Sequence, residues 1–138
     1  MKLTLSAFAV IYEYSNAPVK PGALERVMET LKHRGPDGSD VFLSGGIALG
    51  HFHFRTTPEE NGERQPLGLP GLPFKIVLDG RLDNRAELIS RMSISPAEGK
   101  QLSDAALILH AYARWGGSCF EYFIGEYALV IYDERNAE

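Results

Sequence analysis

Hydrophobic residues follow three different spacings in the first half of the chain. The nearly continuous apolar run over residues 2–12 predicts a strand that is buried on both faces. From residue 21 the spacing becomes helical, because apolar residues recur at intervals of three and four at Leu24, Val27, Met28 and Leu31. Two short apolar runs then flank Ser44-Gly45-Gly46, which predicts a hairpin whose second strand continues to Phe54.

The second half opens with a long irregular segment, residues 57–73, which contains four prolines and three glycines. Loops of this length inside a compact domain tend to be functional or disordered. A short strand is predicted over residues 74–78, and Asp79-Gly80 is expected to end it. Asp83 or Asn84 is then placed to cap a helix.

The clearest helix of the chain follows Ser103, its predicted N-cap, and ends at Gly116-Gly117. Residues 127–132 form the last predicted strand. Because helices and strands mix without regular βαβ alternation, the order of elements predicts an α+β fold. The apolar face of the clearest helix comprises Leu107, Ile108, Ala111, Tyr112 and Trp115.

The composition fits one soluble globular domain. The 138 residues are 44% hydrophobic and 23% charged, and the net charge is -4. Lys and Arg do not gather into a basic stripe, which argues against nucleic acid as a partner. No apolar run approaches the roughly 20 residues of a membrane span. Cys119 is the only cysteine, so an internal disulfide is excluded and a reducing, cytoplasmic location is expected.

Residues 33–38, His-Arg-Gly-Pro-Asp-Gly, stand between the predicted helix and the hairpin. Pro36 disfavours the α conformation at Gly35, so the helix is expected to end before it. Gly, Pro and Asp each restrict or extend the backbone in a different way, and together they predict one rigid, polar surface loop. His33 is expected to order this loop and to have no catalytic role.

The ordered set of motifs resembles the glutamine amidotransferase domain of asparagine synthetases, which is of the N-terminal-nucleophile hydrolase type. The resemblance implies an αββα sandwich over residues 1–138. The matching motifs are, in chain order, residues 33–38, Leu49-Gly50-His51, Gln65-Pro66, Asp79-Gly80, Asn84 ahead of Glu87-Leu88, Ser103-Asp104 with Leu109 and Tyr112, Trp115-Gly116, and Gly125 with Tyr127-Ala128. A second set, in residues 56–59, 62–66 and 79–85, resembles the asparagine-synthetase-related branch that includes lasso-peptide cyclases and is similar to β-lactam synthetase.

Glutamine hydrolysis in this family uses an N-terminal cysteine, whose thiol attacks the side-chain amide while its free α-amine serves as the base. The best register of this chain places Ser6 at that position, and a shift by one places Leu5 there. Neither register supplies a cysteine, and five residues precede Ser6. We therefore expect Ser6 to be a serine of the first core strand.

The resemblance also identifies the residues that stand at the positions of the family's glutamine pocket. Asp79, Gly80 and Arg81 replace an Asn-Gly-Glu segment, whose Asn side chain and Gly amide donate hydrogen bonds to the developing oxyanion. An ionised Asp79 can only accept hydrogen bonds, and Arg81 carries the wrong sign to receive an ammonium group. His53 replaces the arginine that clamps the α-carboxylate, and as a histidine it is expected to be mostly neutral at pH 7. Gly80 and Asp104 are retained, and this set argues against glutamine binding.

Simpler roles are open for several of these residues. His51 and His53 share one face of a strand, which could suggest a metal site, but no Cys or His lies nearby in sequence to complete it, so no metal is expected. Asp104 could simply complement a helix dipole. Asp79 and Arg81 could belong to a surface salt bridge. Cys119 is expected to be a small core residue.

The favoured function is a degenerate glutamine amidotransferase domain of an ATP-dependent amide-forming enzyme related to asparagine synthetase. The resemblance implies a synthetase domain as partner, in the same or another chain. It also implies that ATP and Mg belong to that domain, with no cofactor in this chain. Two alternatives are an active glutaminase, in which a processed Ser6 supplies ammonia for asparagine synthesis, and a stand-alone module that binds a peptide or protein through residues 57–73.

The family continues into a further hairpin after the strand that ends at Tyr132-Asp133. The resemblance therefore implies either a truncated sandwich or a short protein with an open sheet edge. Open edges tend to pair with other strands, so a homodimer is a further expectation.

Overall fold

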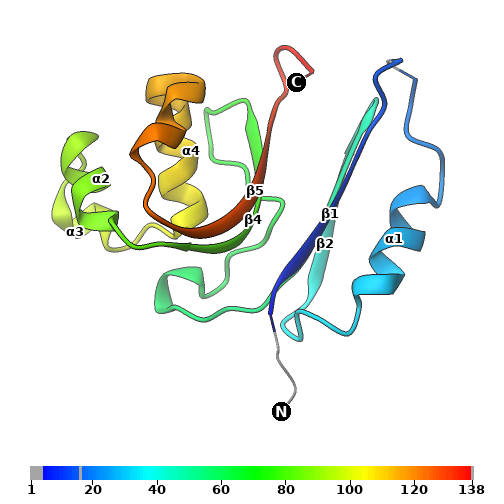
Figure 1. Cartoon of the computed structure of the whole chain (residues 1–138), viewed down its shortest axis with the longest axis horizontal. Helices are drawn as coiled ribbons and strands as arrows, with labels where there is room; N and C mark the ends of the chain where they lie inside the picture. The colour runs from blue at the N-terminus through cyan, green and yellow to red at the C-terminus, as the bar shows by residue number, and fades with distance from the viewer. Residues whose placement is uncertain (1–4, 16, 138) are drawn as a thin grey trace.

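The strands of the domain form two antiparallel sheets in the computed structural model, which describes residues 5–15 and 17–137 (Figure 1). Sheet A has the order β1-β3-β2, and sheet B pairs β4 with β5. The strands are β1 (Ala7–Tyr12), β2 (Ser39–Ser44), β3 (Ile47–Phe52), β4 (Phe74–Leu82) and β5 (Gly125–Asp133). The helices are α1 (Ala23–Leu31), α2 (Arg85–Arg91), α3 (Pro96–Gly99) and α4 (Asp104–Trp115), with 3-10 turns at Pro58–Glu60 and Gly116–Tyr122.

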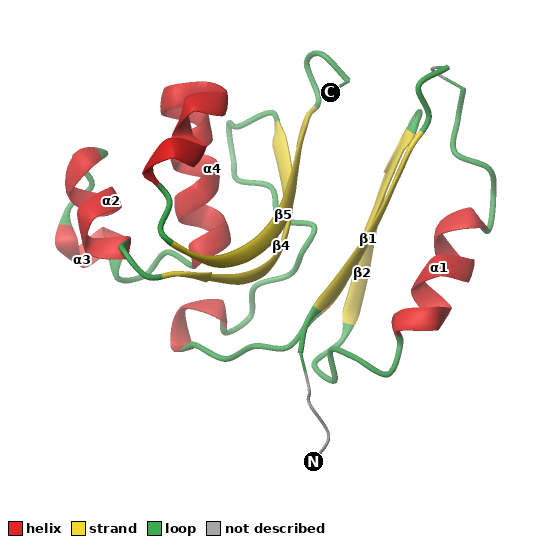
Figure 2. Ribbon diagram, in the orientation of Figure 1, coloured by secondary structure: helices red, strands yellow, loops and turns green. Residues whose placement is uncertain are grey.

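The two sheets face each other, with helices on their outer sides (Figure 2). Strand alternation explains this arrangement, because successive side chains point to opposite faces. Odd-numbered residues of β3, such as Leu49, pack against Val77 and Tyr132 of sheet B, whereas Ala48 packs beneath α1 with Leu24 and Met28 of that helix. The other face of sheet B carries Ile76 and Leu78, which pack with Leu107, Ile108 and Leu109 of α4.

The predicted helix spacing, the hairpin turn and the Ser103 cap are confirmed. The Ser103 hydroxyl accepts a hydrogen bond from the Ala106 amide at 3.1 Å, which satisfies one of the free donors at the start of α4. The mixed α and β content agrees with the predicted fold class. Asn84 precedes α2 as predicted, but its side chain does not cap the helix and instead donates to the Tyr122 carbonyl at 2.9 Å.

Three element boundaries differ from the predictions. The first strand begins at Ala7, so Ser6 precedes it and is not a strand residue, while residues 1–4 lie outside the described part of the chain. The second hairpin strand ends at Phe52. Strand β4 continues through Asp79-Gly80 to Leu82, because Gly80 can adopt a φ of +141°, which residues with a side chain rarely adopt. An added Cβ there would lie 2.5 Å from the Tyr127 Cα, so this glycine allows β5 to pair closely with β4.

The loop of residues 33–38 connects α1 to sheet A and holds two other segments in place. The Gly35 amide donates to the Leu5 carbonyl at 3.0 Å, next to Ser6. The His53 amide donates to the Gly38 carbonyl at 2.8 Å, and the Asp37 amide donates to the His53 carbonyl at 3.0 Å. The predicted rigid loop therefore positions the start of β1 and the residues that follow β3.

Gly35 is expected to be the most sensitive residue of this loop. Its φ is +60°, and an added Cβ would lie 2.5 Å from the backbone carbon of Phe52. We expect Gly35→Ala to lower the free energy of unfolding by roughly 2–5 kcal/mol, the sum of left-handed strain and overpacking. Gly45→Ala is the matched control, because its φ of +54° is similar but nothing lies within 4 Å of the added Cβ. Equal losses of stability in urea denaturation would contradict the role of close packing at Gly35.

Candidate functional site

A small cavity lies beside Ser6, where the start of β1, the end of β3 and the middle of β4 meet. Its volume is about 30 Å³, which is room for a few water molecules at most. Ser6 is half-buried, and its hydroxyl has no hydrogen-bond partner within residues 5–15 and 17–137. The polar lining consists of Ser6, His51, His53, Arg55, Glu60, Glu63 and Gln65.

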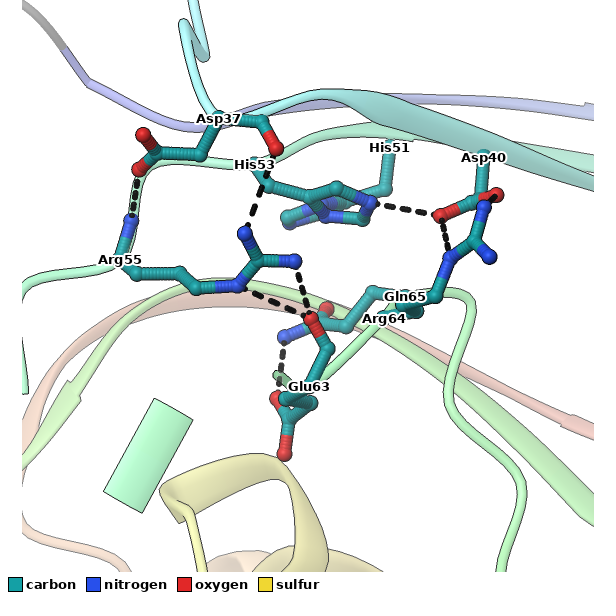
Figure 3. A network of polar contacts seen from close by, with 8 residues as sticks. All are labelled: Asp37, Asp40, His51, His53, Arg55, Glu63, Arg64 and Gln65. Carbon is teal, nitrogen blue, oxygen red and sulfur yellow. Dashed lines mark hydrogen bonds and ion pairs between the residues drawn. The ribbon is translucent and has the colours of Figure 1, made fainter. Parts of the chain in front are cut away.

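A chain of hydrogen bonds runs through this lining from the surface to strand β4. Figure 3 shows its side chains Arg64, Asp40, His53 and His51. Arg64 donates to both carboxylate oxygens of Asp40, through its Nε at 2.7 Å and through its Nη2. Oδ2 of Asp40 lies 2.9 Å from Nε2 of His53, whose Nδ1 lies 2.8 Å from Nδ1 of His51. Nε2 of His51 lies 2.9 Å from the Leu78 carbonyl oxygen. All four imidazole nitrogens are therefore bound to groups of the protein.

Burial and charge set the ionisation of this chain. Burial lowers the pKa of His51 to about 4, so its ring is neutral at pH 7. The hydrogen bond from the Arg64 guanidinium lowers the pKa of Asp40, which is therefore an ionised carboxylate. Alternation explains why these groups meet, because Asp40 of β2 lies directly opposite His51 of β3 in the sheet register.

Residues 55–67, called here the connecting segment, join the end of sheet A to sheet B. Arg55 donates to the Glu63 carbonyl from Nε at 3.1 Å and from Nη2 at 2.6 Å. The Glu63 carboxylate accepts hydrogen bonds from Ser103 and from Gln65, and burial raises its pKa. The connecting segment thus lies against sheet A at one end and against the first turn of α4 at the other.

The outer edge of β4, which faces away from β5, is closed by four residues from other parts of the chain. Ile76 exchanges two backbone hydrogen bonds with Leu67, at 2.8 and 2.9 Å. The Leu78 amide donates to Oε1 of Gln65 at 2.7 Å, while its carbonyl is bound by His51. The Leu82 amide donates to Oδ2 of Asp104 at 2.8 Å. Gln65 and Asp104 therefore replace a neighbouring strand along this edge.

The structure brings together five of the six residues that the resemblance indicated, counting Ser6. Ser6, His53 and Gly80 line the small cavity, and Asp79 and Arg81 line an adjoining groove of about 260 Å³ together with Ser6 and Gly80. Arg81 is exposed and forms ion pairs with Asp83 at 3.1 Å and with Glu126 at 3.6 Å. These five positions therefore surround one region of the surface, although His53 and Arg81 already have protein partners.

Asp104 lies apart from both of these hollows. Its carboxylate accepts the Leu82 amide and forms an ion pair with Arg85, and its side chain is 13% exposed. Arg85 also donates to the Leu102 carbonyl at 2.7 Å. The carboxylate at the start of α4 therefore joins β4 to α2, in addition to any interaction with the helix dipole.

Three polar residues of the site were not singled out from the sequence: Asp40, Glu63 and Gln65. Gln65 was quoted as part of a motif, but its contact with Leu78 requires the tertiary fold. One signal in the sequence could have indicated Asp40. Strand alternation places Asp40 on the same face as Phe42, and their strand pairs with the strand that contains His51.

The remaining candidates are buried residues and a second groove. Cys119 is fully buried, and burial raises its pKa to about 11, so the thiol is protonated in the core. No group of three or more His, Cys, Asp and Glu residues in the described part of the chain could hold a metal ion. A groove of about 640 Å³ lies between α2 and α3 and has mainly apolar walls, including Ile89 and Ile94. Within residues 5–15 and 17–137, no helix has the length and apolar character needed to cross a membrane.

We expect Asp104→Asn to lower the free energy of unfolding by about 1.5–3 kcal/mol, because hydrogen bonds to the Leu82 amide and to Arg85 lose their charged acceptor. Urea denaturation at pH 7 measures this loss. Asp83→Asn is the control, because Asp83 is exposed and pairs only with the exposed Arg81, so little change is expected. Similar losses in the two variants would show that the Asp104 contacts add no stability.

The stability of the domain is expected to fall as the pH is lowered from 6.5 toward 4. Between these values the unfolded chain binds a proton at His51 that the folded chain excludes, because the pKa of the buried ring is lowered to about 4. The expected contribution is on the order of 3 kcal/mol. Denaturation of wild type and His51→Gln across this range measures it as a difference in slope, with the exposed-residue variant His33→Gln as control. A wild-type slope equal to that of His51→Gln would contradict the assignment.

Comparison with known proteins identifies a domain family and several relatives. A family described as a glutamine amidotransferase domain matches residues 7–138. Glutamine-hydrolyzing asparagine synthetase 3 of Bacillus subtilis (strain 168) is 29% identical over 114 residues, which are 81% of this chain and 18% of that protein. The glutamine-hydrolyzing asparagine synthetase of Triphysaria versicolor is 30% identical over 80% of this chain and 19% of its own length.

A probable glutamine-hydrolyzing asparagine synthetase of Schizosaccharomyces pombe is 29% identical over 83% of this chain and 20% of its own length. The chain spans about a fifth of the length of these relatives. The match of the family over nearly all described residues agrees with the order of motifs and with the mixed α and β structure. The chain belongs to the family of class II glutamine amidotransferase domains and is related to the asparagine synthetases.

Proposed function

We propose that this domain has lost glutamine hydrolysis and acts as the non-catalytic binding or scaffold domain of an ATP-dependent amide-forming enzyme. In this proposal the fold is an αββα sandwich of the N-terminal-nucleophile type. The main observation in support concerns three polar side chains at the glutamine-pocket positions. Each is already bound to another residue of the domain: His53, Arg81 and Asp104.

The nucleophile position supports the proposal. Ser6 replaces a cysteine, and a serine hydroxyl needs a neighbouring base to become a nucleophile. His51 and His53 border the same cavity, but their ring nitrogens are bound to each other, to the Leu78 carbonyl and to Asp40. No imidazole nitrogen is therefore left to accept a proton from Ser6.

The oxyanion and substrate-binding positions support it as well. The removal of one oxyanion-hole donor typically costs about 10²–10³ in rate, and Asp79 as a carboxylate offers an acceptor in place of the amide donor. Arg81 is paired with two carboxylates, and Asp104 is occupied by Arg85. A bound amino acid would have to displace these internal ion pairs before it gained its own.

The size of the cavity points in the same direction. Ligand pockets usually have volumes of about 300–1,000 Å³. The cavity at Ser6 has about 30 Å³ and is lined by Phe54, Glu60 and Gly80 among others. The adjoining groove, of about 260 Å³, is also below this range, and glutamine would not fit within the cavity alone.

The partner in this proposal is a synthetase domain in the same or another chain. That domain would hold ATP and Mg²⁺ and form the amide bond, while this domain supplies a binding surface. The relatives named above are glutamine-hydrolyzing asparagine synthetases, of which this chain matches about a fifth. An alternative is an active glutaminase with a processed Ser6, because the Ser6 hydroxyl is free of partners in the described residues and borders Gly80.

A glutaminase assay separates the two possibilities. We expect no release of glutamate from glutamine by the full chain, in which Ser6 has no free α-amine. We also expect none from a variant that begins at Ser6, because Asp79 replaces an oxyanion donor and Arg81 has the wrong charge for the substrate ammonium group. Glutamate released by the variant that begins at Ser6 would overturn the proposal, and intact-mass analysis of the full chain would show whether such processing occurs.

A matched series tests which positions prevent catalysis. Ser6→Cys in a chain that begins at residue 6 is expected to remain inactive, since Asp79 and Arg81 are unchanged. The same chain with Asp79→Asn, Arg81→Glu and His53→Arg is expected to release measurable glutamate. Activity from Ser6→Cys alone would contradict the argument that the pocket positions have lost their function.

A further inference from the structure

We propose that His51 and His53 hold three protons on their four ring nitrogens and so form a single buried cation, which joins sheet A to sheet B only while the third proton is bound. The proposal rests on the partners of each nitrogen, and it is independent of whether the domain hydrolyses glutamine.

The two outer nitrogens must both carry protons. Nε2 of His51 lies 2.9 Å from the carbonyl oxygen of Leu78, and a carbonyl oxygen can only accept a hydrogen bond. Nε2 of His53 lies 2.9 Å from Oδ2 of Asp40. Asp40 accepts two hydrogen bonds from Arg64, a geometry that matches an ionised carboxylate, so this oxygen is also an acceptor.

The two inner nitrogens need one proton between them. Nδ1 of His51 and Nδ1 of His53 lie 2.8 Å apart, a hydrogen-bond distance, so one of them donates and the other accepts. Two neutral imidazoles carry only two protons, and the chain requires three. The pair therefore has a charge of +1 whichever ring holds the middle proton.

The surrounding charges fit one cation at this place. His53 is 4% exposed, and the carboxylate of Asp40 from β2 is its direct partner. The groups that face the pair from the connecting segment are Arg55, Glu60, Glu63 and Arg64. Strand β4 contributes only the Leu78 carbonyl, which the neutral ring of His51 binds. A neutral pair would leave either the half-buried Asp40 carboxylate without its imidazole donor or the two inner nitrogens without a shared proton.

Loss of the third proton must break one link of the chain. If Nε2 of His53 loses its proton, two acceptors face each other at Asp40. If the inner proton is lost, two lone pairs face each other between the rings. Either loss weakens the connection from Asp40 of β2 to Leu78 of β4, next to the Ser6 cavity. The pair therefore acts as a proton-dependent brace between the two sheets.

Nitrogen-15 NMR of the histidine side chains tests the proton count directly, because protonated and unprotonated ring nitrogens have well-separated chemical shifts. At pH 7 we expect the Nε2 atoms of His51 and His53 to be protonated, together with one of the two Nδ1 atoms. His33 and His110 serve as reference histidines in the same spectrum. Two protonated nitrogens in the pair at pH 7, rather than three, would overturn the proposal.

The proton-dependent link between the two sheets predicts a loss of folding stability at high pH, which depends on His51, His53 and Asp40. Above the pH at which the unfolded histidines have lost their protons, the ratio of folded to unfolded chain should fall about tenfold for each pH unit, and it should level off once the folded pair has released its own proton. Asp40→Asn removes the carboxylate partner and should shift proton release to lower pH in the NMR titration, whereas the control Asp83→Asn should leave it unchanged. The proposal fails if Asp40→Asn and Asp83→Asn titrate alike, and wild-type NMR decides the proton count even if Asp40→Asn does not fold.

Discussion

The backbone of the outer edge of β4 is the constraint on which the rest of this domain depends. β5 satisfies one side of the strand, and the other side carries amide and carbonyl groups that cannot remain unpaired in the interior. Leu67 binds this edge at Ile76, Gln65 and His51 bind it at Leu78, and Asp104 binds it at Leu82. Because these partners come from sheet A, the connecting segment and α4, one strand edge brings three parts of the chain together.

The same constraint gives several residues of the matching motifs a role in folding. His51, Gln65 and Asp104 belong to matching motifs, and each binds the backbone of β4 in this structure. Their replacement would leave a buried amide or carbonyl unpaired, at a cost of about 1–3 kcal/mol. Preservation of these residues is therefore explained by folding alone. The loop of residues 33–38 belongs to the same class, since Gly35 and Gly38 hold the segments that flank the Ser6 cavity.

Two carboxylates in and near the site are bound by donors of the protein itself. Asp40 is bound by Arg64 and His53, and Asp104 is bound by Arg85 and the Leu82 amide. Such pairs hold their geometry because a buried charge without a partner is strongly unfavourable. Groups held in this way are poorly suited to bind a substrate.

Local signals in the sequence determined several parts of this protein. The spacing of Leu24 and Met28 predicted α1, Ser103 predicted the start of α4, and the ordered motifs predicted the family. The four-residue helix α3 was missed because so short a segment has no readable period, and the end of β4 was misplaced because Gly80 was interpreted without its neighbour β5. Only the tertiary structure decided that His53 pairs with Asp40 and that Asp104 binds Arg85. Spacing along the chain sets which face a side chain occupies, but the pairing of strands and the closing of sheet edges decide which polar groups are left free for chemistry.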